Sequence, residues 1–195
     1  MRKLYISAAL MLGVLAFSAC EEQDATPVFQ EPTTFVLNTP AYVNGTYDLE
    51  KSTSLELTCS QPDYGFTAAT SYAVEVSLSG VFDGTESTVL GTTYSTARMN
   101  VDAAEMAAAL TALATAADPT LTEEDFPMET EVHVRLIASL TASKKGQIVS
   151  NSIILPSVRL HFALPAVNLP EKLYLIGQCN GWDWGAAYAF VPAYD

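Results

Sequence analysis

Short runs of alternating apolar and polar residues fill the chain from about residue 33 to residue 163. A period of two gives each run one apolar face and one polar face, which is typical of antiparallel strands. The pattern therefore predicts strands with one face in a core and one in solvent. The predicted inward-facing residues are Leu55, Leu57 and Cys59, then Tyr72, Val74, Val76 and Leu78, then Val132, Val134, Leu136, Ala138 and Leu140.

The turns between these runs fit the same interpretation. Asn44-Gly45 suits the positive φ angles of a two-residue hairpin, and Ser143–Gly146 separates two strand-like runs. The last run, IILPSVRLHF, contains Pro156, which has no amide proton for a central ladder. We therefore expect an edge strand or a bulge at Pro156.

One segment has the period of a helix. Asp102 can cap its first turn, Glu105 stands three residues further on as in a capping box, and one apolar face holds Met106, Leu110 and Leu113. The helix should end before Asp118-Pro119 and cover a sheet edge as a crossover. Residues 33–163 thus predict an all-β fold, an immunoglobulin-like β-sandwich of about seven strands with one short crossover helix.

The first residues have the layout of an export signal. Two basic residues precede an apolar run from Leu4 to Phe17, which is shorter than the about 20 residues that a membrane-spanning helix needs. The sequence FSAC then predicts cleavage after residue 19 and acylation of Cys20. Residues 20–32, acidic and proline-containing, are interpreted as a flexible stalk.

The carboxy-terminal part begins a new pattern. Residues 164–171 predict a hinge, and residues 172–195 predict the start of a second β domain that is cut short. This part carries Tyr174, Trp182, Trp184 and Tyr188 within fifteen residues. Flat aromatic faces stack on sugar rings, so Trp182, Trp184 and Tyr174 are candidate carbohydrate-binding residues. The alternative is that they are core residues of an incomplete sandwich.

Charge and cysteine content narrow the classes of function. Cleavage after residue 19 removes two of the nine basic residues and none of the 22 acidic ones, which leaves a net charge of about −15. Such a surface repels nucleic acid and anionic headgroups. With Cys20 acylated, we expect Cys59 and Cys179 to be two buried free thiols.

The residues that catalysis requires are scarce. The only histidines, His133 and His161, lie in strand-like runs away from any metal-ligand spacing, and no phosphate loop or nucleophile elbow is present. The acidic stretch TEEDFPMETE lacks the alternation of a calcium loop and is interpreted as a solvated loop. We therefore expect that the protein is not an enzyme and that it binds no metal and no cofactor.

The order of several motifs resembles a known family. These motifs are the lipobox, the acidic residues Glu21, Glu22 and Asp24, the runs PVFQEPTTFVLNTP and LELTCSQPDYGFTAATSYAVEVSLSG, then VHVRLIA with SNSIIL, and finally LYLIG with GWDW. Together they resemble the amino-terminal portion of SusE-like proteins, outer-membrane starch-binding lipoproteins of starch-utilisation systems. The resemblance covers nearly the whole chain.

The resemblance implies a spacer domain followed by modules that hold α-glucan near an outer-membrane transporter and other surface glycan-binding proteins. It also implies a lipid-anchored outer-membrane protein that faces the cell exterior, because the acidic residues behind Cys20 resemble a surface-export signal. Another hypothesis is a structural or adhesive sandwich that binds a protein partner, which an exposed apolar patch at a sheet edge would favour.

Overall fold

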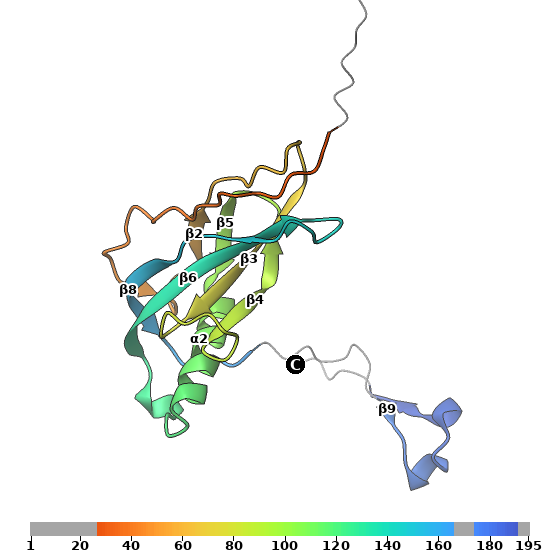
Figure 1. Ribbon diagram of the computed structural model, residues 1–195. Helices are drawn as coiled ribbons and strands as arrows, with labels where there is room; N and C mark the ends of the chain where they lie inside the picture. The colour runs from red at the N-terminus through yellow and green to blue at the C-terminus, as the bar shows by residue number, and fades with distance from the viewer. Residues whose placement is uncertain (1–26, 166–173, 191–195) are drawn as a thin grey trace, which may run out of the picture.

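The large sheet of the sandwich carries most of the strands. In the computed structural model, which describes residues 27–165 and 174–190, its strand order is β1-β8-β6-β3-β4, with β7 beside β6 (Figure 1). Its neighbours are antiparallel except for β1 and β8, which are parallel. The strands are β1 Tyr47–Asp48, β3 Thr70–Ser77, β4 Ser87–Tyr94, β6 Met128–Leu140, β7 Ile148–Val149 and β8 Ile153–Leu160.

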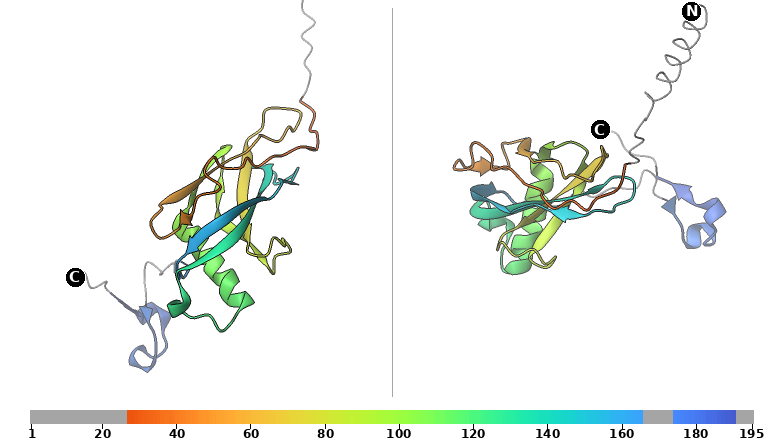
Figure 2. Two further views of the ribbon diagram at one scale, coloured as in Figure 1. Left: turned by 90° about the vertical axis from the view of Figure 1, so that its left-hand side faces the viewer. Right: turned by 45° about the horizontal axis from the view of Figure 1, so that its top comes forward.

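The second layer is a small antiparallel sheet of β2 (Ser54–Thr58) and β5 (Arg98–Asp102). The segment before β1 extends this layer, since Leu37 forms an isolated bridge with Cys59. Asn151, just ahead of β8, accepts from the Leu37 amide at 2.9 Å and donates to its carbonyl at 3.1 Å. The views in Figure 2 show this short layer on one side of the large sheet.

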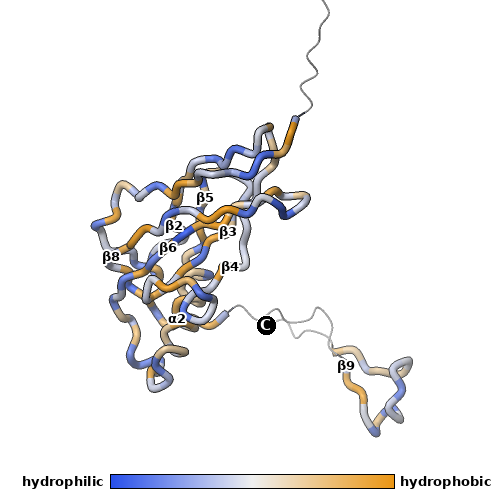
Figure 3. The backbone as a smooth tube through the Cα atoms, viewed as in Figure 1, coloured by the Kyte–Doolittle hydropathy of each residue, from blue (hydrophilic) through white to orange (hydrophobic). Residues whose placement is uncertain are grey.

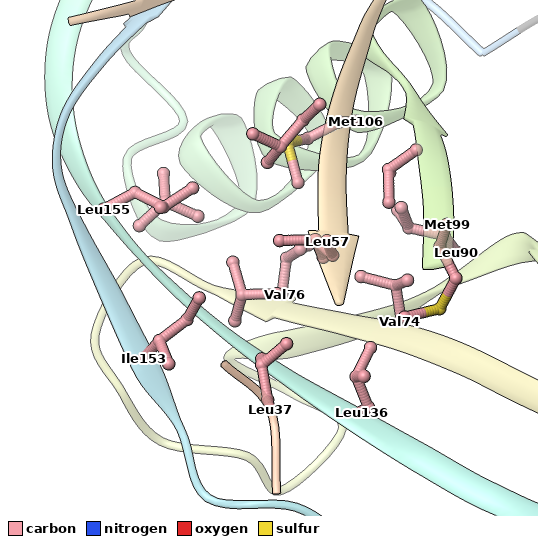
Figure 4. Packing of buried hydrophobic residues seen from close by; sticks show 14 of the residues in the cluster. Leu37, Leu57, Val74, Val76, Leu90, Met99, Met106, Leu136, Ile153 and Leu155 are labelled. Carbon is pink, nitrogen blue, oxygen red and sulfur yellow. The ribbon is translucent and has the colours of Figure 1, made fainter. Parts of the chain in front are cut away.

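Apolar side chains from both layers fill the space between the sheets (Figure 4). Leu57 of β2 meets Val74 and Val76 of β3, and Leu136 of β6 lies in the same cluster. Figure 3 shows the hydrophobic positions recurring along these strands. The predicted inward-facing residues are buried except for Leu78 and Leu140, which are half-buried at strand ends. The predicted all-β sandwich with a short helix is therefore confirmed.

Helix α2 (Ala103–Ala117) follows β5 directly and contacts strands of both sheets. Asp102 caps it by accepting from the Glu105 amide at 2.8 Å, as the sequence predicts. The prediction that Glu105 completes a capping box by bonding back to the Asp102 amide is wrong. Its Oε1 instead accepts from the Thr92 amide at the β4 bulge, at 2.8 Å. The helix thus reaches the sheet edge, but its buried face, including Met106 and Leu110, joins the core. None of the described helices is long and apolar enough to span a membrane.

Two of the three turn predictions are confirmed. The β6–β8 register shifts opposite Pro156, which places a bulge there, and the Ser143–Gly146 turn joins β6 to β7 with positive φ at Lys144 and Gly146. The prediction of a two-residue hairpin at Asn44-Gly45 is wrong. Neither residue has positive φ, and the next strand, β1, pairs in parallel with the distant β8 instead of with a preceding strand.

The expectation that every strand has one wet face is also wrong for β3. Glu75 on its outer face is only 5% exposed, and Ser77 and Ser87 are buried beside it. The loop between β3 and β4 folds back over this face, so that the Phe82 ring lies 4.2 Å from the Arg135 guanidinium carbon. A local period of two identifies a strand, but it does not show which loop covers its outer face.

Candidate functional site

The aromatic residues of the carboxy-terminal part lie in a separate small unit. Its strands β9 (Tyr174–Leu175) and β10 (Tyr188–Ala189) pair in antiparallel fashion, and the loop between them contains two 3-10 turns, η2 (Gln178–Asn180) and η3 (Trp184–Ala186). A single pair of two-residue strands cannot be stable through its ladder alone. The loop must therefore supply much of the order.

Asn180 is the hydrogen-bonding centre of this loop. Its Oδ1 accepts from the Gly177 amide at 2.8 Å, and its Nδ2 donates to the carbonyls of Leu175 and Ala186, each at 3.2 Å. Trp182 takes a left-handed backbone (φ 63°), which is unfavourable for a bulky residue, and its amide donates to the Gly177 carbonyl at 3.0 Å. The loop therefore holds Trp182 in a conformation that it would not adopt freely.

The aromatic side chains of this unit face solvent. Trp182 is 68% exposed, Trp184 is 75% exposed, and Tyr174 and Tyr188 are about half exposed. No residue between 174 and 190 is buried. Asp183 stands between the two tryptophans, and its Oδ1 accepts from the Gly185 amide at 2.8 Å. The arrangement offers flat apolar faces next to a carboxylate that can accept from a hydroxyl group.

The cysteines have different environments. Cys59 and Cys179 are both free thiols, as the sequence predicts, but only Cys59 is buried. Burial raises the pKa of the Cys59 thiol to about 11. The expectation that Cys179 is also buried is wrong, because the β9–β10 unit has no core in which to place it. Cys20, the predicted lipid-attachment residue, lies outside the described residues, as do residues 1–19.

Neither histidine belongs to a described cluster of three or more potential metal-ligating side chains. His133 lies on the outer face of β6, where its Nε2 is 3.0 Å from Glu131 Oε1, and Gly80 of the β3–β4 loop packs against its ring. His161 follows β8, and its carbonyl accepts from Thr111 of α2. Among residues 27–165 and 174–190, no group of three or more His, Cys, Asp or Glu side chains could hold a metal ion.

The predicted solvated acidic loop lies between α2 and β6 and is organised by its own backbone. It contains one 3-10 turn, η1 (Glu123–Asp125), whose Asp125 accepts from both the amide and the hydroxyl of Thr122 at 2.8 and 2.9 Å. These hydrogen bonds, of which the one to the amide has the larger effect, lower the pKa of Asp125. The carboxylate is thus already occupied by its own loop.

The buried ion pair on the outer face was not found by sequence reasoning. Glu75 Oε2 lies 2.6 Å from Arg135 Nε, and Glu75 Oε1 accepts from the Ser87 hydroxyl at 2.8 Å. Both carboxylate oxygens of the buried Glu75 thus have partners, whereas the Arg135 side chain is 25% exposed, and this is the arrangement of a structural pair. The register of β3 and β6 places Glu75 directly opposite Arg135, a relation that only a strand-pairing pattern could have revealed.

Two hollows lie on the sandwich. One, of about 420 Å³, lies between the end of α2 at Leu113 and Ala116 and the β3–β4 loop at Leu78 and Thr85. The other, of about 510 Å³, is formed by residues 61–68 and Thr70. Neither contains a histidine or a cysteine. The exposed aromatic surface of the β9–β10 unit is therefore the stronger candidate for a binding site.

The fold is thus that of a β-rich sandwich protein with one helix and a small unit whose aromatic side chains are exposed. The sequence pattern of the SusE outer membrane protein family matches residues 22–135, more than half of the chain. The chain therefore belongs to the SusE outer membrane protein family. It is an outer membrane protein of a Sus-type polysaccharide-utilisation system. No solved structure matches the chain.

Proposed function

We propose that this chain is a glycan-binding lipoprotein of a starch-utilisation-type system, in which the part before the β9–β10 unit acts as anchor and spacer. In this proposal residues 1–19 are removed, Cys20 carries the lipid, residues 20–32 are the stalk and residues 33–163 are the spacer domain. Residues 164–171 form a hinge to a second β domain that begins within residues 172–195. The family match over residues 22–135, which spans most of the proposed stalk and most of the sandwich, supports this organisation.

The observation that carries glycan binding is the exposure of Trp182 and Trp184 on a hydrogen-bonded loop. Two large indole faces in solvent lose apolar contact with water when a pyranose ring stacks on them, and Asp183 beside them can accept from a sugar hydroxyl. Tyr174 supplies a third exposed ring on β9. The ligand class is therefore α-glucan or a related polysaccharide, and the chemistry is binding without catalysis.

The adhesive alternative has less support. Exposed apolar residues occur on the outer face of the large sheet, such as Val89 on β4 and Ile154 on β8. Polar side chains separate them, however. Across the strands, Val89 pairs with Glu75, which pairs in turn with Arg135, and Ile154 pairs with His133. These side chains therefore do not form one apolar patch for a protein partner.

The proposal is tested by affinity electrophoresis of residues 21–195 through gels with and without amylopectin. We expect the wild type to be retarded by amylopectin, and a Trp182→Ala, Trp184→Ala variant to lose the retardation. Tyr42→Ala is the matched control, because Tyr42 is a strongly exposed aromatic residue of the sandwich. Unretarded wild type would contradict a binding site at Trp182 and Trp184 and would leave only the anchor and spacer roles.

A further inference from the structure

The chain contains two Asn-Gly pairs, Asn44-Gly45 and Asn180-Gly181. An asparagine before a glycine is chemically unstable in water, because the glycine has no side chain to hinder the attack of its amide nitrogen on the asparagine side chain. In the sequence the two pairs are alike in this respect. The structure makes them different, since one lies in a turn of the sandwich and the other at the centre of the β9–β10 loop.

Asn44 lies in an exposed turn just ahead of β1. Two backbone hydrogen bonds close this turn, one from the Val43 amide to the Pro40 carbonyl at 3.1 Å and one from the Gly45 amide to the Tyr42 carbonyl at 2.9 Å. Asn44 and Gly45 are both exposed, and within the described residues no hydrogen bond holds the Asn44 carboxamide. A single exposed backbone hydrogen bond opens readily, so the Gly45 nitrogen can reach the Asn44 side chain.

The Asn180 side chain has no such freedom. Its Oδ1 accepts from the Gly177 amide at 2.8 Å, and its Nδ2 donates to the carbonyls of Leu175 and Ala186, each at 3.2 Å. Gly181 follows in a left-handed backbone conformation (φ 63°) that ends the η2 turn. Rotation of the Asn180 carboxamide toward the Gly181 nitrogen breaks all three side-chain hydrogen bonds.

We propose that Asn44 is a site of spontaneous deamidation and that the fold protects Asn180 from the same reaction. The Gly45 amide loses its proton to solvent, and its nitrogen attacks the Asn44 Cγ. The bond from Cγ to the side-chain nitrogen breaks, and ammonia leaves with a proton. The succinimide ring that forms takes up one water and opens at either carbonyl to aspartate or isoaspartate. Each event therefore replaces an amide by a carboxylate and adds one negative charge.

The reaction has different structural consequences at the two sites. At Asn44 the new carboxylate lies in solvent, away from the core. At Asn180 the Nδ2 donor would be lost, and a carboxylate would face the carbonyls of Leu175 and Ala186, which it cannot hydrogen-bond. The hydrogen bonds that order the β9–β10 loop around Trp182 thus also preserve the residue on which this order depends.

The test follows both asparagines in the full chain at pH 8. The folded protein is incubated in water enriched in heavy oxygen, and mass spectrometry of peptide fragments measures the uptake of one solvent oxygen at each asparagine. Asn44 should convert at least about tenfold faster than Asn180, because one backbone hydrogen bond opposes the attack at Asn44 and three side-chain hydrogen bonds oppose it at Asn180. Asn38, which precedes Thr39, is the internal control and should convert more slowly than Asn44.

Two further measurements separate the fold from the local sequence. In urea the rates at Asn44 and Asn180 should converge, because unfolding removes the hydrogen bonds of both sites. Asn44→Gln keeps a carboxamide but requires a larger ring, so this variant should take up no label at position 44 and leave the rate at Asn180 unchanged.

Equal rates at Asn44 and Asn180 in the folded protein would overturn the proposal, as would an Asn44 rate no higher than that of Asn38. A difference between Asn44 and Asn180 that persists in urea would assign it to the neighbouring residues and not to the fold, which also overturns the proposal.

Discussion

The sandwich and the β9–β10 unit are stabilised in opposite ways. The sandwich buries a continuous cluster that runs from Phe35 to Leu160, while no residue between 174 and 190 is buried. The small unit relies instead on the hydrogen bonds of Asn180, and its aromatic rings remain in water. The difference teaches that the same apolar residue types serve packing in one region and are available for binding in the other, because only the first has a second layer to pack against.

The largest expected effect comes from the core. Leu57→Ala should lower the free energy of unfolding of the sandwich by about 3–4 kcal/mol, because Leu57 is fully buried between the sheets and its removal leaves a cavity. Trp184→Ala deletes a larger side chain, but it should change this free energy of unfolding by less than about 0.5 kcal/mol, because the side chain is exposed. Urea unfolding followed by far-ultraviolet circular dichroism measures both. Comparable losses in the two variants would break the comparison.

A second test compares the two thiols in residues 21–195. Burial raises the pKa of the Cys59 thiol to about 11, so that little of it is thiolate at pH 8, and its Sγ lies 3.7 Å from the Ala97 carbonyl oxygen. We expect a maleimide to react with Cys179 at least about a hundredfold faster than with Cys59 in the native protein. In urea the two rates should converge. Mass spectrometry of the labelled peptides gives both rates, and equal rates in the native protein would show that Cys59 is not enclosed.

A smaller effect is expected from the ion pairs of the sandwich. Glu75→Ala leaves Arg135 without its partner under the Phe82 loop and should cost about 2 kcal/mol of unfolding free energy, a value reduced for the partial exposure of Arg135. Glu56→Ala removes the exposed pair with Arg98 and should cost less than about 0.5 kcal/mol. The difference between the two midpoints of urea unfolding checks this prediction. A surface-like cost for Glu75→Ala would mean that water reaches the pair.

Local sequence features were sufficient where the physical cause is local. The alternation in residues 131–140 predicts the inward face of β6, because side chains of a strand alternate between its two faces. Asp102 predicts the start of α2, since a capping carboxylate acts within one turn, and the missing amide proton of Pro156 predicts the bulge. These features depend on neighbouring residues and can be read directly from the chain.

The remaining features depend on residues far apart in the sequence. The parallel pairing of β1 with β8 overrides the hairpin expected at Asn44-Gly45, and the bulge in β4 takes the Glu105 carboxylate away from its own helix. The sequence showed that the Trp182 and Trp184 cluster could serve either as a core or as a binding surface. The tertiary structure places both rings in solvent.

The sequence by itself thus determined the strands, the helix cap and the family resemblance, because these follow from local periodicity and motif order. Only the tertiary structure decided which faces are covered. It buried Glu75, left Cys179 and the tryptophans exposed, and stacked Phe29 on Tyr64. Burial depends on which distant segment packs over a residue, and that is a property of the assembled layers.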